Sequence, residues 1–444
     1  MTLSSVAQPL PLWQQLQATA VALAAVAQGV SASAALLRVP NALRSGVQSL
    51  LFASLRNWGR AHALRGILAQ RKPPPEVDSL LCVALALSWL PEQAPYEPFT
   101  LVNQAVEAAK RSPKMKAQAT FVNACLRRFL RERDALVAVT NKDLQASWNH
   151  PVWWIELLQH DHPNHWQQIL HADLVPAPMV MRVNVRRIER SALAAQWLAL
   201  GIMAHPVGPY GLMLVNPLPV DRIPGFAQGL CSVQDGGAQL AAPLLLEALP
   251  DHGKHSRILD ACAAPGGKSA HLLELSDAQV VSLDIDEVRC EHITGNLQRL
   301  GLSAQVVAAD ALKVNEWWDG QAFDAILLDA PCTASGIVRR HPDVVWLRRA
   351  SDVAQLAKLQ QSLLHTLWPL LKPGGVMLYC TCSVFRREGQ AQVKSFLQHN
   401  TQAHGLPCVG HLLPQNSNNN GGVTDNLPSD HDGFFYALLQ KPLD

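Results

Sequence analysis

The second half of the chain alternates short apolar runs with amphipathic segments. We interpret the apolar runs as strands; they are "RILDACAAP", "AQVVSLDID", "AQVVAAD", "FDAILLDAP" and "VMLYCTC". Apolar strands that alternate with helices are typical of a mostly parallel, doubly wound sheet with helices on both faces. We therefore predict a Rossmann-like α/β domain over residues 236–444. We expect "GFFYALLQK" to be its last strand and residues 401–432, which include "NSNNNGG", to be a polar loop.

The first part of the chain is helical by its pattern of apolar residues. Two groups recur at positions i, i+3, i+4 and i+7: Val102, Ala105, Val106 and Ala109, and then Val122, Cys125, Leu126 and Phe129. This spacing predicts amphipathic helices, and the Pro-rich stretches "KPPPE" and "LPEQAPYEPF" separate them. We predict an all-α domain over residues 1–147. Short apolar runs among many Pro and Trp residues predict a small α+β connecting subdomain over residues 148–235.

Composition narrows the class of protein. The 37 basic and 35 acidic residues leave a net charge of +2, so nucleic-acid binding would need local basic patches. Nine cysteines without a repeating spacing argue against a secreted disulfide framework and indicate a reducing cytoplasm. The apolar run 18–27 is too short to span a bilayer and precedes the first basic residue, Arg38, so we predict a buried helix there. We expect a soluble, cytoplasmic monomer without a membrane partner.

The turn "DACAAPGGK" (260–268) follows the first predicted strand. It is not a P-loop, because Cys262 stands where that motif needs glycine, and the dinucleotide fingerprint G-x-G-x-x-G is also absent. Its small residues still let the backbone approach a ligand, at the sheet edge where α/β proteins bind ligands and beside the amino end of a helix. The sequence therefore predicts a ligand site without a pyrophosphate-binding loop.

Acids end the next two predicted strands. Asp284 lies 24 residues after Asp260, which is about the distance at which a carboxylate binds the ribose hydroxyls of an adenosine, and Asp310 ends the third strand. Asp286 competes with Asp284 for this role, but Asp284 lies nearer the strand end. Such acids suit S-adenosylmethionine, which carries an adenosine but no pyrophosphate. The other interpretation, that they are ordinary strand-end acids, stays open.

An aspartate and three cysteines lie at the ends of the next two predicted strands. Asp329 and Cys332 lie in "LLDAPCTASG", and Cys380 and Cys382 lie in "YCTCSV". Three interpretations are open: buried structural cysteines, a metal site completed by a histidine, and covalent catalysis.

Covalent catalysis explains the acid and the thiols together. Carbon 5 of cytosine is a poor nucleophile until an ionised thiol adds to carbon 6. A carboxyl group beside N3 and the exocyclic amine would stabilise that adduct, and a second thiol would assist removal of the C5 proton or release of the product. We predict no metal at this site. By spacing alone, this interpretation does not exclude the structural one.

The motifs in their order resemble the bacterial RNA cytosine-5 methyltransferases of the Sun/Fmu type. The match rests on "DACAAPGGK", on "LLDAPC" followed by "GIVRRHPDVVW", and on "TCSV". "LVNQAVEAAK" and "FVNACLRRFL" look like the NusB-type RNA-binding domain of the small-subunit rRNA members of this family. "WNHPVWWIELL" and "PMVMRVNV" resemble their connecting segment, and "DGFFYALLQK" resembles their last strand. The resemblance therefore covers almost the whole chain.

The resemblance implies a class I methyltransferase that uses S-adenosylmethionine to methylate carbon 5 of one cytosine in 16S rRNA, of the cytosine-967 type. It implies Cys382 as the nucleophile, Cys332 as the residue that helps to release the product, and Asp329 as a contact of the base. The residues that it implies for the cofactor are Cys262, Ala263, Ala264, Pro265, Gly266, Gly267, Lys268, Asp284, Asp310 and Asp329.

The chain departs from the family pattern at three places. Cys380 stands where a small residue is usual, and we interpret it as a packing residue. Gly389 follows Glu388 where the family often has asparagine, and "QDGGAQ" (234–239) is rich in glycine where we expect bulkier residues. The resemblance leaves open what these departures change near the base.

RNA contacts are predicted at two basic clusters. "RRHPDVVWLRR" includes Arg339 and Arg340, and the helical domain includes Arg127 and Arg128. Arginine clusters of this kind contact phosphates, although a solvated helix face is an equal interpretation for the second cluster. Two other functions stay open: methylation of transfer RNA, and RNA binding without catalysis as a ribosome assembly factor. A methyltransferase for a small molecule or a protein would not need the thiols.

Overall fold

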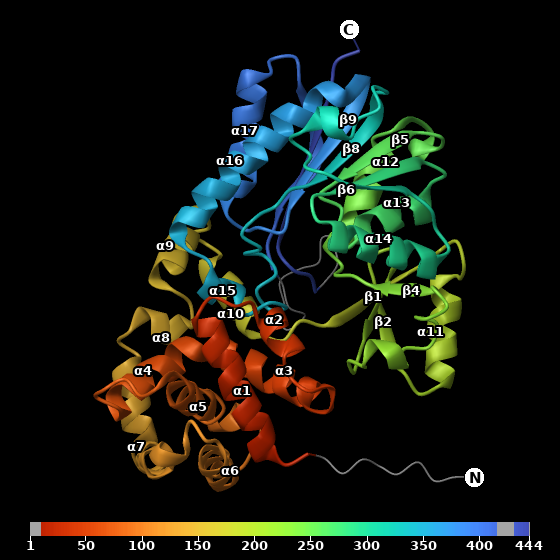
Figure 1. The fold of residues 1–444 in the computed structure, drawn as a ribbon. Coiled ribbons are helices and arrows are strands. Elements are labelled where there is room, and N and C mark those ends of the chain that lie inside the picture. The colour runs from red at the N-terminus through yellow and green to blue at the C-terminus, as the bar shows by residue number, and fades with distance from the viewer. Residues whose placement is uncertain (1–9, 415–429, 444) are drawn as a thin grey trace, which may run out of the picture. The chain divides into compact units, whose positions relative to one another are not determined.

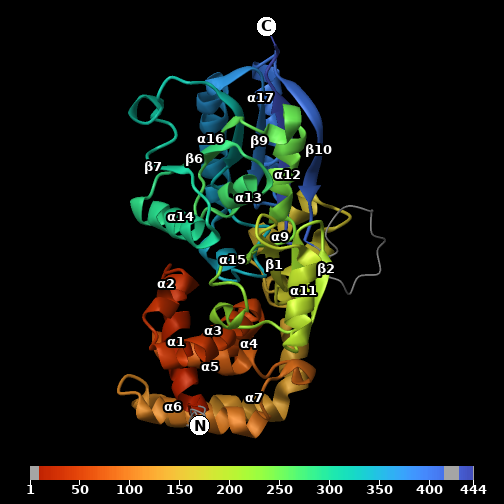
Figure 2. The same ribbon diagram turned by 90° about the vertical axis from the view of Figure 1, so that its right-hand side faces the viewer.

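The computed structural model describes residues 10–414 and 430–443. The chain forms two compact units (Figures 1 and 2). Of the described residues, 10–175 and 338–348 form the first unit, and 176–337, 349–414 and 430–443 form the second. No helix within the described ranges is long and apolar enough to cross a membrane. The stretch "NSNNNGG" lies outside the described residues.

The first unit is helical throughout its described part. Its helices are α1 (Leu12–Ala27), α2 (Ala32–Leu37), α3 (Asn41–Arg56), α4 (Trp58–Leu68), α5 (Pro75–Ala86), α6 (Pro98–Arg111), α7 (Ala119–Thr140), α8 (Leu144–Trp148), α9 (Val152–Asp161), α10 (Trp166–Leu174) and α15 (Val344–Leu347). The apolar run 18–27 forms most of α1, and its Leu23 is buried in one core with Leu81 and Phe129. The predicted helical front end is confirmed.

A segment from the second half of the sequence belongs to this helical unit. Within Val338–Arg348, the Trp346 indole donates a hydrogen bond to the Leu55 carbonyl (2.9 Å), and the Asp343 carboxylate accepts one from the Ala32 N–H (2.8 Å). These bonds and the burial of the Trp346 ring against α4 fix the segment on the helices. The first predicted RNA-binding cluster is therefore part of the helical unit.

The second unit begins with a small antiparallel sheet. In the described residues its strands pair in the order β2-β3-β1-β4. The elements are β1 (Met179–Val183), α11 (Arg190–Ala199), β2 (Ala204–Val207), β3 (Gly211–Leu214) and β4 (Cys231–Val233). Trp197 of α11 is fully buried in a core with Met181 and Leu212. The connecting region is α+β from β1 to β4, as predicted, whereas α9 and α10, which lie within the predicted bounds 148–235, belong to the first unit.

The larger part of the second unit is a mostly parallel sheet, which in the described residues has seven strands in the order β10-β11-β9-β8-β5-β6-β7. The strands are β5 (Arg257–Ala261), β6 (Gln279–Asp284), β7 (Gln305–Ala308), β8 (Phe323–Asp329), β9 (Leu371–Thr381), β10 (His404–Leu412) and β11 (Phe434–Gln440). The helices are α12 (Ala241–Glu247), α13 (Gly267–Leu275) and α14 (Glu287–Leu300) on one face, and α16 (Ala350–Leu367) and α17 (Gln390–His399) on the other (Figure 1). The predicted Rossmann-like domain is confirmed.

The parallel strands place their carboxyl ends along one edge of this sheet. β5 lies at the centre, paired in parallel with β6 on one side and β8 on the other, and the outer strands β7 and β9 continue the parallel pattern. β11 runs antiparallel to both β9 and β10. Because ligands of open α/β sheets bind at the carboxyl ends of parallel strands, this edge is the expected place of the site.

The predicted loop over residues 401–432 is wrong in its first part. The strand β10 lies at 404–412 and pairs with β11 in antiparallel register. The sequence of this strand did not predict a strand, because it contains Gly405, Pro407 and Gly410, and glycine and proline are uncommon inside strands. Pairing with an apolar neighbour strand overrides that local preference.

Candidate active site

The Pro-Gly-Gly turn, residues 262–268, joins the end of β5 to α13. Gly266 has a φ of +90°, and a Cβ there would lie 3.0 Å from the Ile293 side chain, so the position requires glycine. At Gly267 the nearest described neighbour of an added Cβ is the Gln234 amide, at 3.5 Å. The turn therefore combines a backbone that requires glycine at Gly266 with a second glycine, Gly267, at which an added Cβ would meet the Gln234 amide at an ordinary contact distance.

Strand-end acids line the sheet edge beside this turn. The Asp284 carboxylate is 2% exposed and accepts a hydrogen bond from the Ala264 N–H (3.0 Å), and Arg289 pairs with it at 3.4 Å. Asp286 instead caps α14 through its side chain. Asp310, just after β7, accepts a backbone N–H two residues further on. Of the two competing acids, Asp284 is thus the one that contacts the turn.

Asp260, the first residue of the motif, lies at the site although the sequence predicted no role for it. Its side chain is fully buried near the end of β5, and one carboxylate oxygen accepts a hydrogen bond from Ser269. The other oxygen, Oδ1, is buried without a hydrogen-bond partner among the described residues. Burial raises the pKa of Asp260 to about 7. An unpaired buried carboxylate oxygen beside the turn suits a cationic ligand group, because such an oxygen is costly when it has no partner.

Lys268 links the turn to the end of β8. Its Nζ lies 2.5 Å from Oδ2 of Asp329, and Cys380 Sγ donates to the other oxygen at 3.5 Å. Burial lowers the pKa of Lys268, but the charge of Asp329 outweighs burial, so the pKa lies above its ordinary value. Burial and the same carboxylate raise the pKa of Cys380. Cys380 is therefore a neutral, fully buried thiol, which agrees with a packing role.

Cys332 and Cys382 lie side by side at this edge. Their sulfur atoms are 3.4 Å apart, both side chains are half-buried, and they remain separate thiols. The hydrogen bond with Cys382, followed by burial, raises the pKa of Cys332 well above its usual range. The described residues hold no group of three or more histidines, cysteines or acids arranged around a metal position. The geometry provides a thiol with a second thiol as its hydrogen-bond partner.

Glu388 is a second residue that sequence reasoning missed as part of the site. Its buried carboxylate accepts hydrogen bonds from Thr333 N (2.9 Å), Thr333 Oγ1 (2.5 Å), Ser383 Oγ (2.6 Å) and Gln360 Nε2 (3.2 Å). Thr333 and Ser383 directly follow the two site cysteines in the sequence. Burial raises the pKa of Glu388, and the hydrogen bonds oppose that shift. One carboxylate thus holds both cysteine loops.

Two departures from the family pattern have packing explanations. A Cβ at Gly389 would lie 2.6 Å from the His411 ring and 2.7 Å from the Phe435 ring, so His411 of β10 fills the space that a longer side chain would need. In "QDGGAQ", a Cβ at Gly237 would lie 2.9 Å from the Phe434 ring, and the Gly237 carbonyl accepts a hydrogen bond from Tyr436. Both glycines allow β11 and its neighbours to approach closely.

The predicted RNA-binding arginines lie in the helical unit. Arg339 is 1% exposed, whereas Arg340 is half-buried. On α7, Arg127 is exposed and donates to the Asn123 side chain, and Arg128 pairs with an acid one turn further on. The burial of Arg339 removes its side chain from the surface, so it is not part of the RNA contacts proposed below.

Comparison with known proteins shows the family of the chain. Residues 247–440 match the family model described as 16S rRNA methyltransferase RsmB/F, and residues 150–221 match the ferredoxin-like domain of the RsmF/B-like methyltransferases. The ribosomal RNA small subunit methyltransferase B of Vibrio cholerae is 42% identical over 347 residues, which are 77% of this chain and 76% of that protein. The chain belongs to the RsmB/F family of 16S rRNA methyltransferases.

Solved structures share the fold of this RsmB/F family member. The crystal structure of PH0851 has a TM-score of 0.75 at 22% identity and covers 97% of this chain and 99% of that one. The structure of NSun6 from Pyrococcus horikoshii with SFG has a TM-score of 0.54 at 20% identity, over 66% of this chain and 98% of that one. As a member of the RsmB/F family, the chain is an S-adenosylmethionine-dependent RNA methyltransferase.

Proposed function

We propose that the chain methylates carbon 5 of one cytosine in 16S rRNA, of the cytosine-967 type, through a covalent bond between Cys382 and carbon 6 of the base. The observation that carries this proposal is the distance of 3.4 Å between the sulfur atoms of Cys332 and Cys382. Methylation of nitrogen or oxygen needs no thiol, because those atoms are nucleophiles themselves. Two thiols in contact at the ligand-binding edge therefore support a carbon nucleophile.

The part of the sheet edge at the ends of β5, β6 and β7 fits S-adenosylmethionine. We assign the turn 262–268 to the cofactor, with Asp284 at the ribose and Asp310 beside the adenosine. The unpaired oxygen of Asp260 suits the ammonium of the amino acid end, and the lack of a side chain at Gly267 allows close backbone approach. When bound, the cofactor supplies an electrophilic methyl group on its sulfonium. Asp329 lies between the turn 262–268 and the two cysteines, and it is paired with Lys268 of the turn.

The side chains at the ends of β8 and β9 then have separate roles in the reaction of the base. The Cys382 thiolate forms a bond to carbon 6, the electron pair of the C5–C6 double bond shifts to carbon 5, and carbon 5 becomes nucleophilic. Asp329 stabilises the adduct at N3 and the exocyclic amine. After carbon 5 has gained its methyl group, Cys332, which has first released its own proton to solvent, takes the proton from carbon 5. The C5–C6 double bond forms again, and the bond between carbon 6 and sulfur breaks, which frees the Cys382 thiolate.

The contact between the two sulfur atoms links the ionisation of Cys332 to the state of Cys382. Hydrogen bonding to Cys382 is the largest cause of the raised pKa of Cys332. Once Cys382 is bonded to the base, it no longer opposes the ionisation of Cys332. Burial, the second cause, still raises the pKa of Cys332 in the intermediate, so formation of the bond to the base removes only part of the opposition to its ionisation.

The target base has to be outside a stacked helix, because its ring carbons are otherwise out of reach. We propose that the helical domain, predicted over residues 1–147, binds the RNA in the manner of a NusB-type domain. Arg340, Arg127 and Arg128 are the proposed phosphate contacts, and binding through them would weaken with salt. A reducing cytoplasm, where rRNA is assembled, suits a site that depends on two thiols.

The test is the chemical identity of the methylated nucleoside. The full chain is incubated with isotope-labelled S-adenosylmethionine and either 16S rRNA or transfer RNA, and the RNA is digested and analysed by mass spectrometry. We expect labelled 5-methylcytidine in 16S rRNA alone. Methylation on nitrogen or a ribose oxygen would contradict the carbon mechanism, and 5-methylcytidine in transfer RNA alone would replace the proposed substrate. No label in either RNA would favour an assembly factor without catalysis.

A further inference from the structure

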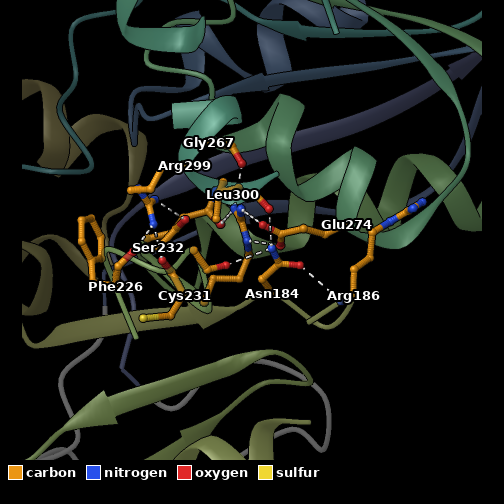
Figure 3. A network of polar contacts seen from close by, with 12 residues as sticks. Asn184, Arg186, Phe226, Cys231, Ser232, Gly267, Glu274, Arg299 and Leu300 are labelled. Carbon is orange, nitrogen blue, oxygen red and sulfur yellow. Dashed lines mark hydrogen bonds and ion pairs between the residues drawn. The ribbon is translucent and has the colours of Figure 1, made fainter. Parts of the chain in front are cut away.

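A buried arginine from the small antiparallel sheet is bonded to α13, the helix that the Pro-Gly-Gly turn opens. Arg182, on β1, is completely buried. Its guanidinium forms a bidentate pair with Glu274, through Nε to Oε2 (2.8 Å) and Nη2 to Oε1 (2.7 Å). Figure 3 shows Glu274 and Gly267, both on α13, within one network of polar contacts. A bidentate arginine–carboxylate pair fixes both distance and orientation.

The same guanidinium also reaches the turn itself. Nη1 of Arg182 donates to the carbonyl of Gly267 (2.7 Å) and to the side-chain oxygen of Gln234 (2.5 Å). Gly267 is the first residue of α13, and Glu274 lies seven residues, about two turns, further along the helix. One planar group therefore holds α13 at both ends. A lysine has no planar fork and cannot make these contacts together.

The remainder of this network holds the two parts of the unit together without touching the turn. Asn184, two residues after Arg182, donates to the carbonyls of Gly229 and Leu300. Arg299 on α14 donates to the carbonyls of Phe226 and Cys231 and to Ser232 (Figure 3). The polar contacts of the small sheet therefore form two groups. Those of Asn184 and Arg299 fix the small sheet to the end of α14, and those of Arg182 fix it to α13 and the first glycine of that helix.

We propose that Arg182 is a positioning residue for the cofactor, acting through the Gly267 carbonyl and Glu274. The small sheet thereby sets the place of the turn, and the affinity for S-adenosylmethionine depends on a residue outside the methyltransferase sheet. The inference rests on the proposed assignment of the turn to the cofactor. It follows from the sharing of one guanidinium between the helix and the turn, because a displaced α13 would move Gly267 away from the ligand.

The test compares cofactor affinity with stability in full-length variants, by isothermal titration calorimetry with S-adenosylmethionine and by thermal unfolding. Arg182→Lys keeps a charge beside Glu274 but loses the fork, and Arg182→Met with Glu274→Leu removes the pair without leaving a buried charge. Asn184→Ala is the matched control, since it weakens the same interface away from the turn. We expect both Arg182 variants to raise the Kd at least tenfold and Asn184→Ala to change it less than twofold.

A second readout separates positioning from general loosening. Amide hydrogen exchange in the cofactor-free chain should become faster over the turn and the start of α13 in Arg182→Lys, but not in Asn184→Ala. An unchanged Kd in both Arg182 variants, or an equal rise in Kd for Asn184→Ala, would overturn the inference. Asp284→Asn reports on the assignment of the turn: if it leaves the Kd unchanged as well, the proposed cofactor site is wrong, and if it alone raises the Kd, only the role of Arg182 is wrong.

Discussion

The two halves of the sheet edge are built in different ways. At the ends of β5 to β7, acids contact backbone N–H groups, and Asp260 keeps one oxygen without a partner in the described residues. At the ends of β8 and β9, side chains bond to one another: the two sulfur atoms are in contact, and Glu388 accepts hydrogen bonds from both cysteine loops. The first half has an acceptor left for a ligand, whereas the second half is already arranged for chemistry.

This difference predicts that substitutions in the two halves affect different quantities. Variants at β8 and β9 should lose turnover and keep cofactor affinity, whereas variants at β5 to β7 should lose affinity. Lys268 and Asp329 form an ion pair that joins the halves, so a change at either residue should affect both affinity and turnover.

The largest effect is expected for Cys382→Ser. Turnover should fall by at least about 10³-fold, because a hydroxyl is far less ionised than a thiol at neutral pH and a poorer nucleophile. The Kd for S-adenosylmethionine should stay within twofold. Single-turnover methylation of 16S rRNA and calorimetry measure the two quantities. Cys380→Ala removes a neighbouring thiol that donates to Asp329 but forms no bond to the base in the proposed mechanism. It is the control and should keep turnover within about tenfold; equal losses in both variants would contradict the assignment.

Glu388→Gln should lower turnover by about 10- to 100-fold, and destabilise the fold by about 1–3 kcal/mol, because the amide NH₂ that replaces one carboxylate oxygen cannot accept the hydrogen bonds that this oxygen accepts from its two partners. The loss should appear in the rate of methylation and not in the Kd for the cofactor. Gln392→Ala removes hydrogen bonds to the carbonyls of Ala357 and Arg387 and serves as the control for stability. If that control lost turnover to the same extent, Glu388 would have no specific role in placing the cysteines.

Cofactor affinity should depend on pH through Asp260. Burial raises the pKa of its carboxyl to about 7 in the cofactor-free chain, so the group is neutral below that pH and an ammonium would have to bind its ionised form. Well below pH 7, each further unit should weaken binding by about tenfold. Calorimetry at pH 7.5, 6.5 and 5.5 measures this slope. Asp260→Asn should bind weakly with no slope, and Asp310→Asn should keep the slope; a flat profile in the unchanged protein would contradict the role of Asp260.

The smallest effect is expected for Gly389→Asn, next to Glu388 in the half of the edge formed by β8 and β9. The new side chain meets the rings of His411 and Phe435, so the free energy of unfolding should fall by about 1–3 kcal/mol. Urea unfolding measures the change. His411→Ala in the same chain should recover part of the loss, since it opens the space; a Gly389→Asn variant as stable as the original chain would show that packing does not explain this glycine.

The sequence predicted what depends on local pattern. Alternating apolar runs predicted the parallel sheet, the apolar stripes predicted α6 and α7, and strand-end positions predicted that Cys332 and Cys382 meet at one edge. It did not predict contacts between distant segments. Glu388 comes six residues after Cys382 in a short helical turn, and nothing local shows that its carboxylate reaches Thr333, 55 residues earlier.

Two other features were hidden for related reasons. The strand β10 carries Gly and Pro residues that local preference assigns to a loop, and only its pairing with β11 makes it a strand. The segment Val338–Arg348 follows a site cysteine in the sequence but belongs to the helical unit. Its Arg339 is buried although its basic sequence is typical of a surface patch. Burial of a charged side chain depends on tertiary packing, which composition does not report.

The most direct test of the account is to trap the bond between protein and RNA. Cys332→Ala and Cys382→Ala are each mixed with S-adenosylmethionine and 16S rRNA and run on a denaturing gel, and the linked peptide is identified by mass spectrometry. We expect a stable adduct through Cys382 in Cys332→Ala and none in Cys382→Ala. An adduct only in Cys382→Ala would exchange the roles of the two cysteines. No adduct, together with undiminished methylation by Cys382→Ala, would contradict the covalent mechanism.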